Sequence, residues 1–150
     1  MKILNDLKIK IFADGADLES IKKLSKIDYI KGYTTNPSLM KKAGITDYKE
    51  FALKLLSEIK DKPISFEVFS DDLIEMEKQA EEIASWGENV NVKIPITNTQ
   101  KKSTSNLIKK LSSRGVICNI TAIFTIDQIK EVLEVLDKST PAILSIFAGR

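Results

Sequence analysis

Lys93 is the residue of this sequence whose type and surroundings point most directly to covalent chemistry. It lies inside residues 90–96 (VNVKIPI), an apolar run with the composition of a buried strand. Because burial disfavours the charged ammonium, a lysine there is suited to form a Schiff base with a carbonyl group. The alternative is a lysine whose stem packs in the core while its ammonium pairs with Glu67 or Asp14.

Asp14 and Glu67 are the candidate acid–base groups, since Asp14 comes at the end of the first predicted strand and Glu67 late in the third. Two carboxylates beside a buried lysine can share the proton transfers of a reaction. Asp14 could instead cap the following helix, although Asp17 could do so equally well, and Glu67 could pair with an outer-face lysine. The sequence has no histidine, which excludes Ser-His-Asp and Cys-His nucleophile systems and removes the commonest zinc ligand.

Strand-like and helix-like segments alternate along the chain. Apolar runs predict strands at about 8–13, 28–33, 64–69, 90–94, 116–120 and 142–147. Between them, spacings near 3.6 residues predict helices such as 71–86 and 126–136. Helix starts are expected at Asp17, at Ser70 or Asp71, and at Thr125 with Gln128, while Pro37 suits a first helical turn. Such βα repeats predict an α/β fold with parallel strands, and residues 1–150 are expected to form a single domain.

The alternation of side chains within the strands favours a closed barrel over an open sheet. Asn91 and Lys93 share one face of their strand, against two apolar residues on the other. The same alternation separates polar from apolar residues in 65–68, 119–121 and 144–147. The first strand is not followed by the glycine-rich loop of a nucleotide-binding sheet. Polar residues late in several strands predict a TIM-type (β/α)8 barrel with about six of the eight βα units present.

Composition excludes several classes of protein. The formal net charge of +2 gives no basic footprint for nucleic acid, and no apolar run approaches the ~20 residues of a membrane helix. The single cysteine, Cys118, permits no intramolecular disulfide and fits a reducing compartment. We therefore expect a cytoplasmic protein that binds neither nucleic acid nor membranes. Gly32, Gly87 and Gly115 are expected to mark helix ends or strand starts.

Six short motifs in order resemble those of the transaldolase family over nearly the whole chain. They are residues 12–14 (FAD), 34–38 (TTNPS), 65–68 (SFEV), 90–95 (VNVKIP), 119–121 (NIT) and 145–150 (SIFAGR). The resemblance implies a class I, metal-independent transferase that needs no cofactor and acts on sugar phosphates. Lys93 would match the Schiff-base lysine, Asp14 the acid/base at the C4 hydroxyl, and Glu67 the carboxylate that handles protons through a water.

The resemblance also implies a substrate-binding set. These residues would position the water and the dihydroxyacetone hydroxyls, line the site or bind phosphate: Thr34, Asn36, Asn119, Thr121, Ser145, Phe147 and Arg150. A related branch, fructose-6-phosphate aldolase, typically has glutamine where Glu67 stands, so Glu67 favours transaldolase.

The sequence reaches six strands, whereas a whole barrel of this type needs about 200 residues or more. The resemblance therefore implies a C-terminal truncation relative to a whole barrel. Three functions stay open: a transaldolase or fructose-6-phosphate aldolase-like enzyme, a non-catalytic fragment that needs a partner chain or forms a homo-oligomer, and a phosphosugar-binding protein without turnover.

Overall fold

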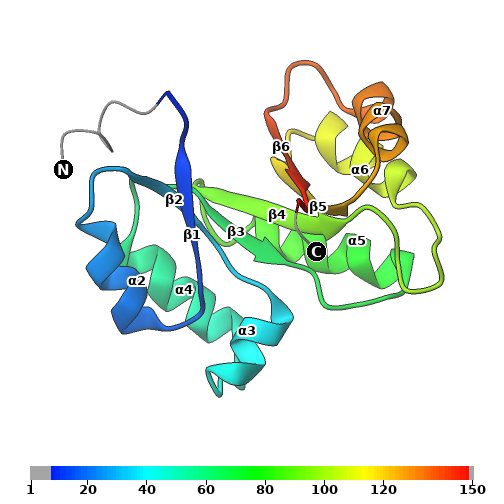
Figure 1. Ribbon diagram of the computed structural model, residues 1–150. Helices are drawn as coiled ribbons and strands as arrows, with labels where there is room; N and C mark the ends of the chain where they lie inside the picture. Colours follow the sequence, from blue (N-terminus) through cyan, green and yellow to red (C-terminus); the bar gives the residue numbers. More distant parts are fainter. Residues whose placement is uncertain (1–7, 149–150) are drawn as a thin grey trace. The chain divides into compact units, whose positions relative to one another are not determined.

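The computed structural model describes residues 8–148, in which six strands alternate with helices (Figure 1). The elements of the first part are β1 (Ile11–Asp14), α2 (Leu18–Ser25), β2 (Ile30–Thr34), α3 (Pro37–Lys42), α4 (Tyr48–Glu58) and β3 (Ile64–Glu67). Those of the second part are α5 (Leu73–Ala84), β4 (Val90–Pro95), α6 (Ser105–Ser113), β5 (Cys118–Ile123), α7 (Ile126–Val135) and β6 (Ala142–Ile146). All six predicted strands are present, with bounds that differ by a few residues.

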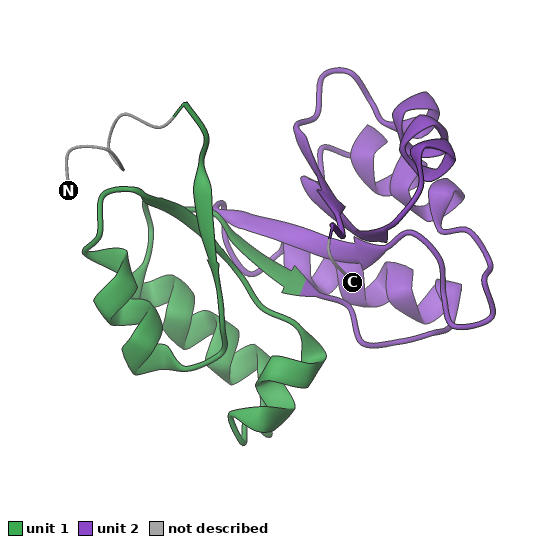
Figure 2. Ribbon diagram, viewed as in Figure 1, with its two compact units in different colours: residues 1–66 green, residues 67–150 purple. Residues whose placement is uncertain are grey.

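The chain divides into two compact units, residues 1–66 and residues 67–150 (Figure 2). Unit 1 contains β1, β2 and most of β3 with helices α2, α3 and α4. Unit 2 begins at Glu67, the last residue of β3, and contains β4, β5 and β6 with helices α5, α6 and α7. The expectation of a single domain stays a prediction.

In unit 1, parallel strands bring Asp14 beside Thr34 and, one layer below, Phe12 beside Gly32. A Cβ atom on Gly32 would lie 2.3 Å from the ring of Phe12. Gly32 therefore lies inside β2 and makes room for the Phe12 ring. The expectation that it marks a strand start was wrong, because the reason for this glycine is a side chain on the neighbouring strand.

In unit 2, β5 pairs in parallel with β4 on one side and with β6 on the other. The outer faces of β4 and β5 supply the apolar core, since Val92, Ile94, Ile120 and Ile123 are fully buried. Near its carboxyl end β5 is irregular, because three residue steps from Ile120 to Ile123 match two on β6. Such an extra residue is a β-bulge.

The described helices except α6 begin at side-chain caps, some of which the sequence predicted. Asp17 caps α2, and Thr125 with Gln128 forms a full capping box on α7, so both predictions are confirmed. The cap of α5 is Asp72, so Ser70 and Asp71 were wrong. Asp72 accepts hydrogen bonds from two backbone N–H groups of the first turn, whereas the carboxylate of Asp71 is bound elsewhere.

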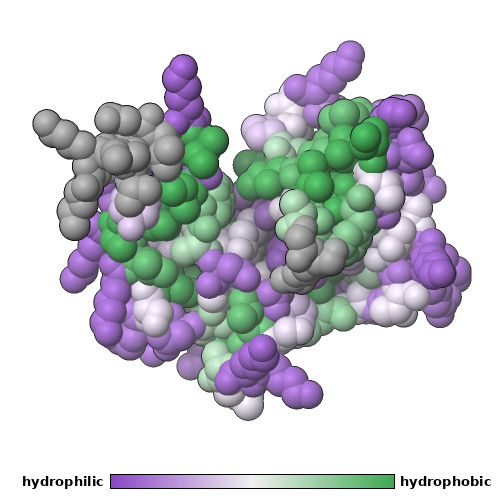
Figure 3. All heavy atoms as spheres, viewed as in Figure 1, coloured by the Kyte–Doolittle hydropathy of each residue, from purple (hydrophilic) through white to green (hydrophobic). Residues whose placement is uncertain are grey.

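Unit 2 carries apolar side chains on its surface over α7 and β6 (Figure 3). The large apolar residues exposed in this region are Phe124, Ile126, Leu133 and Ile146. Among residues 8–148, no helix combines the length and hydropathy needed to cross a bilayer.

Candidate active site

A partly buried ion pair joins β3 and β4 in unit 2. The Nζ atom of Lys93 lies 3.2 Å from Oε2 of Glu67, and the two side chains are 10% and 17% exposed. The N–H of Val68 donates to the carbonyl of Lys93 at 3.1 Å, which holds the end of β3 beside β4. The pairing of this lysine with Glu67, one of the alternatives that the sequence suggested, is therefore present within unit 2. At this separation the carboxylate lies within reach of a proton on Nζ of Lys93, as a proton-transfer partner must.

Asn119 and Ser145 form a second polar contact in unit 2. Asn119 is the register partner of Lys93 on β5, and Oγ of Ser145 donates to Oδ1 of Asn119 at 2.7 Å. Thr121 follows two residues later on the same face of β5. Its hydroxyl is buried and has no hydrogen-bond partner among residues 8–148. Lys93, Asn119 and Thr121 therefore form one polar surface across two strands.

Asp14 and Thr34 form the polar contact of unit 1. Oγ1 of Thr34 donates to Oδ1 of Asp14 at 2.8 Å, and the two residues are register partners on β1 and β2. Asp14 is exposed. Because Asp17 accepts the N–H of Ser20 at 2.9 Å as the cap of α2, Asp14 does not serve as a helix cap. Its carboxylate is left for other chemistry.

Asn36 has a structural role in unit 1. Its Oδ1 accepts the N–H of Leu39 at 3.0 Å and so caps α3, with Pro37 in the first turn as predicted. This bond uses one lone pair of the amide oxygen, in a side chain that the family resemblance assigns to substrate binding. The substrate-binding role of Asn36 stays a prediction.

Phe147 follows β6 and lies against a residue that the sequence did not single out. Its ring meets that of Phe124 edge to face, with centroids 5.4 Å apart. Phe124 follows β5, so the contact depends on the pairing of β5 with β6, and the sequence carries no local signal for it. Arg150, the predicted phosphate-binding residue, lies outside the described residues.

Two loops of unit 2, one after Glu67 and one after Lys93, are tied together by Asp71. Its carboxylate accepts the N–H and the hydroxyl of Thr99, each at 2.7 Å, and its carbonyl accepts the amide of Asn98 at 3.1 Å. The two bonds from Thr99 hold the pKa of Asp71 below its ordinary value. Sequence reasoning missed this contact because 28 residues separate its partners.

The described residues offer little for metal or thiol chemistry. Among residues 8–148, no three His, Cys, Asp or Glu side chains are grouped so that they could hold a metal ion. Burial raises the pKa of the Cys118 thiol to about 12, which keeps it protonated at neutral pH. Lys93 and Glu67 bring an amine and a carboxylate together in unit 2.

An amine beside a carboxylate on a β/α scaffold is compatible with many reactions, and comparison with known proteins narrows them. A model of the transaldolase/fructose-6-phosphate aldolase family matches residues 11–150. The chain belongs to this family. The predicted resemblance is thereby confirmed.

Curated relatives of this transaldolase-family chain are longer than it is. A probable transaldolase of Dehalococcoides mccartyi is 42% identical over 120 residues, which cover 80% of this chain and 54% of the relative. A probable transaldolase of Carboxydothermus hydrogenoformans is 39% identical over 142 residues, which cover 95% of this chain and 62% of the relative. The chain thus spans about half to three-fifths of the length of these relatives.

A solved structure supports the barrel fold. Dihydrodipicolinate synthase from Rhodopseudomonas palustris, a TIM-barrel enzyme, matches with a TM-score of 0.59 and 14% identity over 93% of this chain and 53% of that chain. At this identity the likeness shows the fold alone. Together with the parallel βα repeats, it confirms a TIM-type (β/α)8 fold of which this transaldolase-family chain contains about six units.

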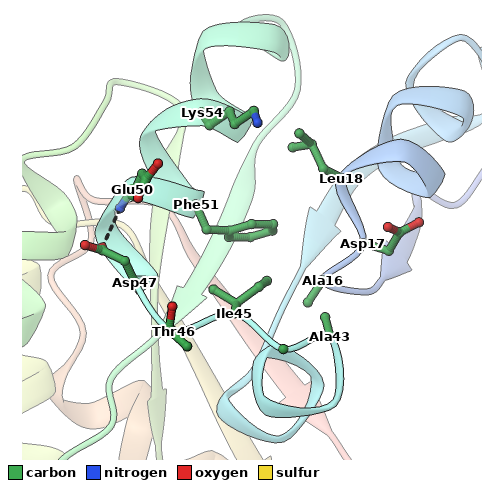
Figure 4. Close-up of a pocket in the computed structure, with 11 residues that line it drawn as sticks. Ala16, Asp17, Leu18, Ala43, Ile45, Thr46, Asp47, Glu50, Phe51 and Lys54 are labelled. Atoms are coloured by element: carbon green, nitrogen blue, oxygen red, sulfur yellow. Dashed lines mark hydrogen bonds between the residues drawn. The ribbon is translucent and has the colours of Figure 1, made fainter.

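Two cavities are lined by residues that do not belong to the predicted site. In unit 1, a cavity of about 350 Å³ separates Ala16 and Leu18 from Ile45 and Phe51, with Lys54 at its rim (Figure 4). In unit 2, a cavity of about 380 Å³ is lined by the two loops that Asp71 ties together. Neither contains a residue that the transaldolase-family resemblance assigns to catalysis or substrate binding.

Proposed function

We propose that this chain carries the catalytic residues of a transaldolase-type transferase, which moves a dihydroxyacetone unit between sugar phosphates through a Schiff base on Lys93. The observation that carries the proposal is the Lys93–Glu67 pair, 3.2 Å apart and largely buried, in a chain of the transaldolase/fructose-6-phosphate aldolase family. A lysine amine attacks a ketone once its proton has been removed, and the Glu67 carboxylate lies within reach of that proton.

The proposed reaction begins when Glu67 takes a proton from Lys93, directly or through a water. The free amine adds to the C2 carbonyl of a ketose phosphate, and loss of water from the carbinolamine gives an iminium. Asp14 then removes the proton of the C4 hydroxyl, and the C3–C4 bond breaks. The aldose phosphate leaves, and the electron pair stays on the dihydroxyacetone unit as an enamine. Addition of the enamine to a second aldose phosphate, followed by hydrolysis, restores Lys93.

The polar residues of the two units are proposed to bind substrate. Asn119, Thr121 and Ser145 of unit 2 would position the dihydroxyacetone hydroxyls and the water, and Phe147 would line the site. Thr34 and Asn36 of unit 1 and Arg150 complete the proposed set. Sedoheptulose 7-phosphate and fructose 6-phosphate are the proposed donors, and the proposed setting is the pentose phosphate pathway of carbohydrate metabolism in the cytoplasm.

A fructose-6-phosphate aldolase-like lyase is the second candidate, because the matching family includes both activities. It would use the same Schiff base, but hydrolysis would release free dihydroxyacetone instead of transferring the unit to a second aldose. The carboxylate at Glu67, in place of the glutamine typical of that branch, favours the transferase.

A partner chain is a further part of the proposal. The chain covers 54% of one relative, and unit 2 exposes apolar side chains on α7 and β6. A second copy or a chain that completes the barrel would cover them, and the mass in solution tests for either. A non-catalytic fragment or a phosphosugar-binding protein would carry the same residues without turnover.

Borohydride trapping tests the central step. The chain is incubated with fructose 6-phosphate and sodium borohydride, and the reduced adduct is located by intact-mass and peptide mass spectrometry. We expect one adduct, on Lys93, that is lost in Lys93→Met and kept in Lys110→Met, which removes an exposed lysine paired with Glu77. A folded chain that gives no adduct, or one on other lysines, would contradict the proposal.

A further inference from the structure

The bulge of β5 lies where Thr121 faces β6. Ile120 pairs with Leu144 and Ile123 with Ile146, so both Thr121 and Ala122 face Ser145. Ala122 has a φ of 58°, in the left-handed region that residues other than glycine seldom adopt. The extra residue of the bulge is therefore also a residue under backbone strain.

Neighbouring strands hold the backbone on both sides of Ala122. The N–H of Ile96, just after β4, donates to the carbonyl of Thr121 at 2.9 Å, and the N–H of Phe147, just after β6, donates to the carbonyl of Ile123 at 2.8 Å. The bulge is thus fixed at each end by a hydrogen bond. The strain at Ala122 persists because relaxing it would break one of these bonds.

The hydroxyl groups beside the bulge are paired in an unexpected way. In an unbroken register Thr121 alone would lie opposite Ser145, at a distance where two hydroxyls commonly bond. Instead, Ser145 donates to Asn119, and the Thr121 hydroxyl is buried without a partner among the described residues. A buried polar group without a hydrogen bond costs stability, so its presence calls for a reason.

We propose that Ala122 is a positioning residue: its bulge keeps the Thr121 hydroxyl from pairing with Ser145 and so leaves that hydroxyl for an oxygen of a bound polyhydroxy-ketone or of its reacting water. The ligand assigned to the Thr121 hydroxyl rests on the proposed function. The separation of the Thr121 and Ser145 hydroxyls is independent of that function, because it follows from the register and the strain alone.

A thermal double-mutant cycle tests this separation without any activity. Thr121→Val removes an unpaired buried hydroxyl, so we expect it to raise the Tm of the parent chain by about 2 to 4 °C. Deleting Ala122 removes the bulge but leaves the inner and outer faces of β5 unchanged. In that background Thr121 and Ser145 can bond, and Thr121→Val should lower the Tm. Glycine adopts a positive φ freely, so Ala122→Gly should keep the bulge. In the Ala122→Gly background we therefore expect Thr121→Val to raise the Tm, as in the parent. The same sign in parent and deletion would overturn the proposal.

The second arm measures how fast borohydride traps the fructose 6-phosphate adduct on Lys93. We expect Thr121→Val to slow trapping at least fivefold in the parent and to have no further effect once Ala122 is deleted. Trapping unchanged by Thr121→Val would overturn the role of the hydroxyl. A parent chain that forms no adduct refutes the proposed function instead, while the thermal cycle still decides whether the bulge separates the hydroxyls.

If the chain that lacks Ala122 does not fold, a third experiment can be done in the parent chain alone. If Thr121 and Ser145 do not bond, the Tm shifts of Thr121→Val and Ser145→Ala add in the double variant. Shifts that fail to add by more than the error of the melts would show that the hydroxyls are coupled and would overturn the proposal.

Discussion

The two units bring polar residues together in different ways on strands of the same kind. In unit 1 the contact is a neutral hydroxyl bonded to an exposed carboxylate, Thr34 to Asp14, at 2.8 Å. In unit 2 it is a charged pair, Lys93 and Glu67, of which no more than 17% of either side chain is exposed. A hydrogen bond at the surface can be exchanged for water at little cost, whereas a buried charge depends on its partner.

The strands that carry these contacts also differ in burial, and those of unit 2 are the more buried. No residue of β1 is fully buried, and its ring at Phe12 packs against a glycine. All of β4 except Pro95 is buried, as is all of β5 except Ala122. Unit 2 therefore holds the Lys93 amine in a tightly packed sheet, whereas the Asp14 carboxylate of unit 1 lies on a less buried strand. We therefore expect mutations at the two contacts to change the stability of the chain by very different amounts.

The largest effect is expected from breaking the charged pair. Glu67→Ala leaves the Lys93 ammonium without this carboxylate, and we expect a loss of about 3 kcal/mol in the free energy of unfolding, measured by urea denaturation. Glu75→Ala is the control, because it breaks an exposed ion pair with Lys78 and should change stability little. If the two variants lost equal stability, burial would not distinguish this pair from a surface one.

A smaller effect is expected in the packing of unit 1. Gly32→Ala places a methyl group 2.3 Å from the Phe12 ring, so the ring must move. We expect destabilisation by about 1 to 3 kcal/mol, measured by chemical denaturation. Gly15→Ala adds the same methyl group where no other atom lies within 4 Å and should have little effect. Equal effects of the two variants would show that the Phe12–Gly32 contact does not limit β1.

The exposed contact of unit 1 should matter less still. Thr34→Val removes the hydroxyl that Asp14 accepts, and water can replace it, so we expect a loss of about 1 kcal/mol or less by the same measurement. Thr34→Ser keeps the donor and should retain most of the stability. A loss as large as that of Glu67→Ala would remove the contrast between the units.

The smallest effect concerns acid stability in unit 2. Hydrogen bonds from Thr99 lower the pKa of Asp71, so this carboxylate adds stability above its ordinary value of 3.8 and loses it as the pH falls through the lowered value. Asp71→Asn should therefore lower the Tm slightly above that range and flatten its fall in acid, so that the curves of parent and variant converge at low pH. Melts recorded from pH 7 down to pH 2 would check this, and parallel curves for parent and variant would contradict it.

Much of the fold follows from periodicity and caps that lie close together in sequence. The apolar runs located all six strands, and Asp17, Pro37 and Thr125 marked helix starts because a cap acts on backbone only a few residues away. The prediction for α5 failed, since Ser70, Asp71 and Asp72 are all good caps, and the sequence does not show that the carboxylate of Asp71 is bound to Thr99 instead.

The candidate site was predictable in its residue types but not in its contacts. The strand alternation put Lys93 and Asn119 on inner faces, yet it did not show that Glu67 lies in contact with Lys93. The bond of Ser145 to Asn119 spans 26 residues and the bulge at Ala122 departs from the alternation itself. Such features depend on how neighbouring strands pair, and the alternation within one strand does not show where a bulge interrupts it.

The burial of Cys118 has a practical consequence for studying unit 2. As the only cysteine of the chain, it lies at the start of β5, fully buried and held as an unreactive thiol. An alkylating reagent can therefore reach it only when β5 opens, and the rate of labelling reports the free energy of that opening when reclosing is fast. The parent sequence thus contains a natural probe of local unfolding on β5, the strand next to that of Lys93.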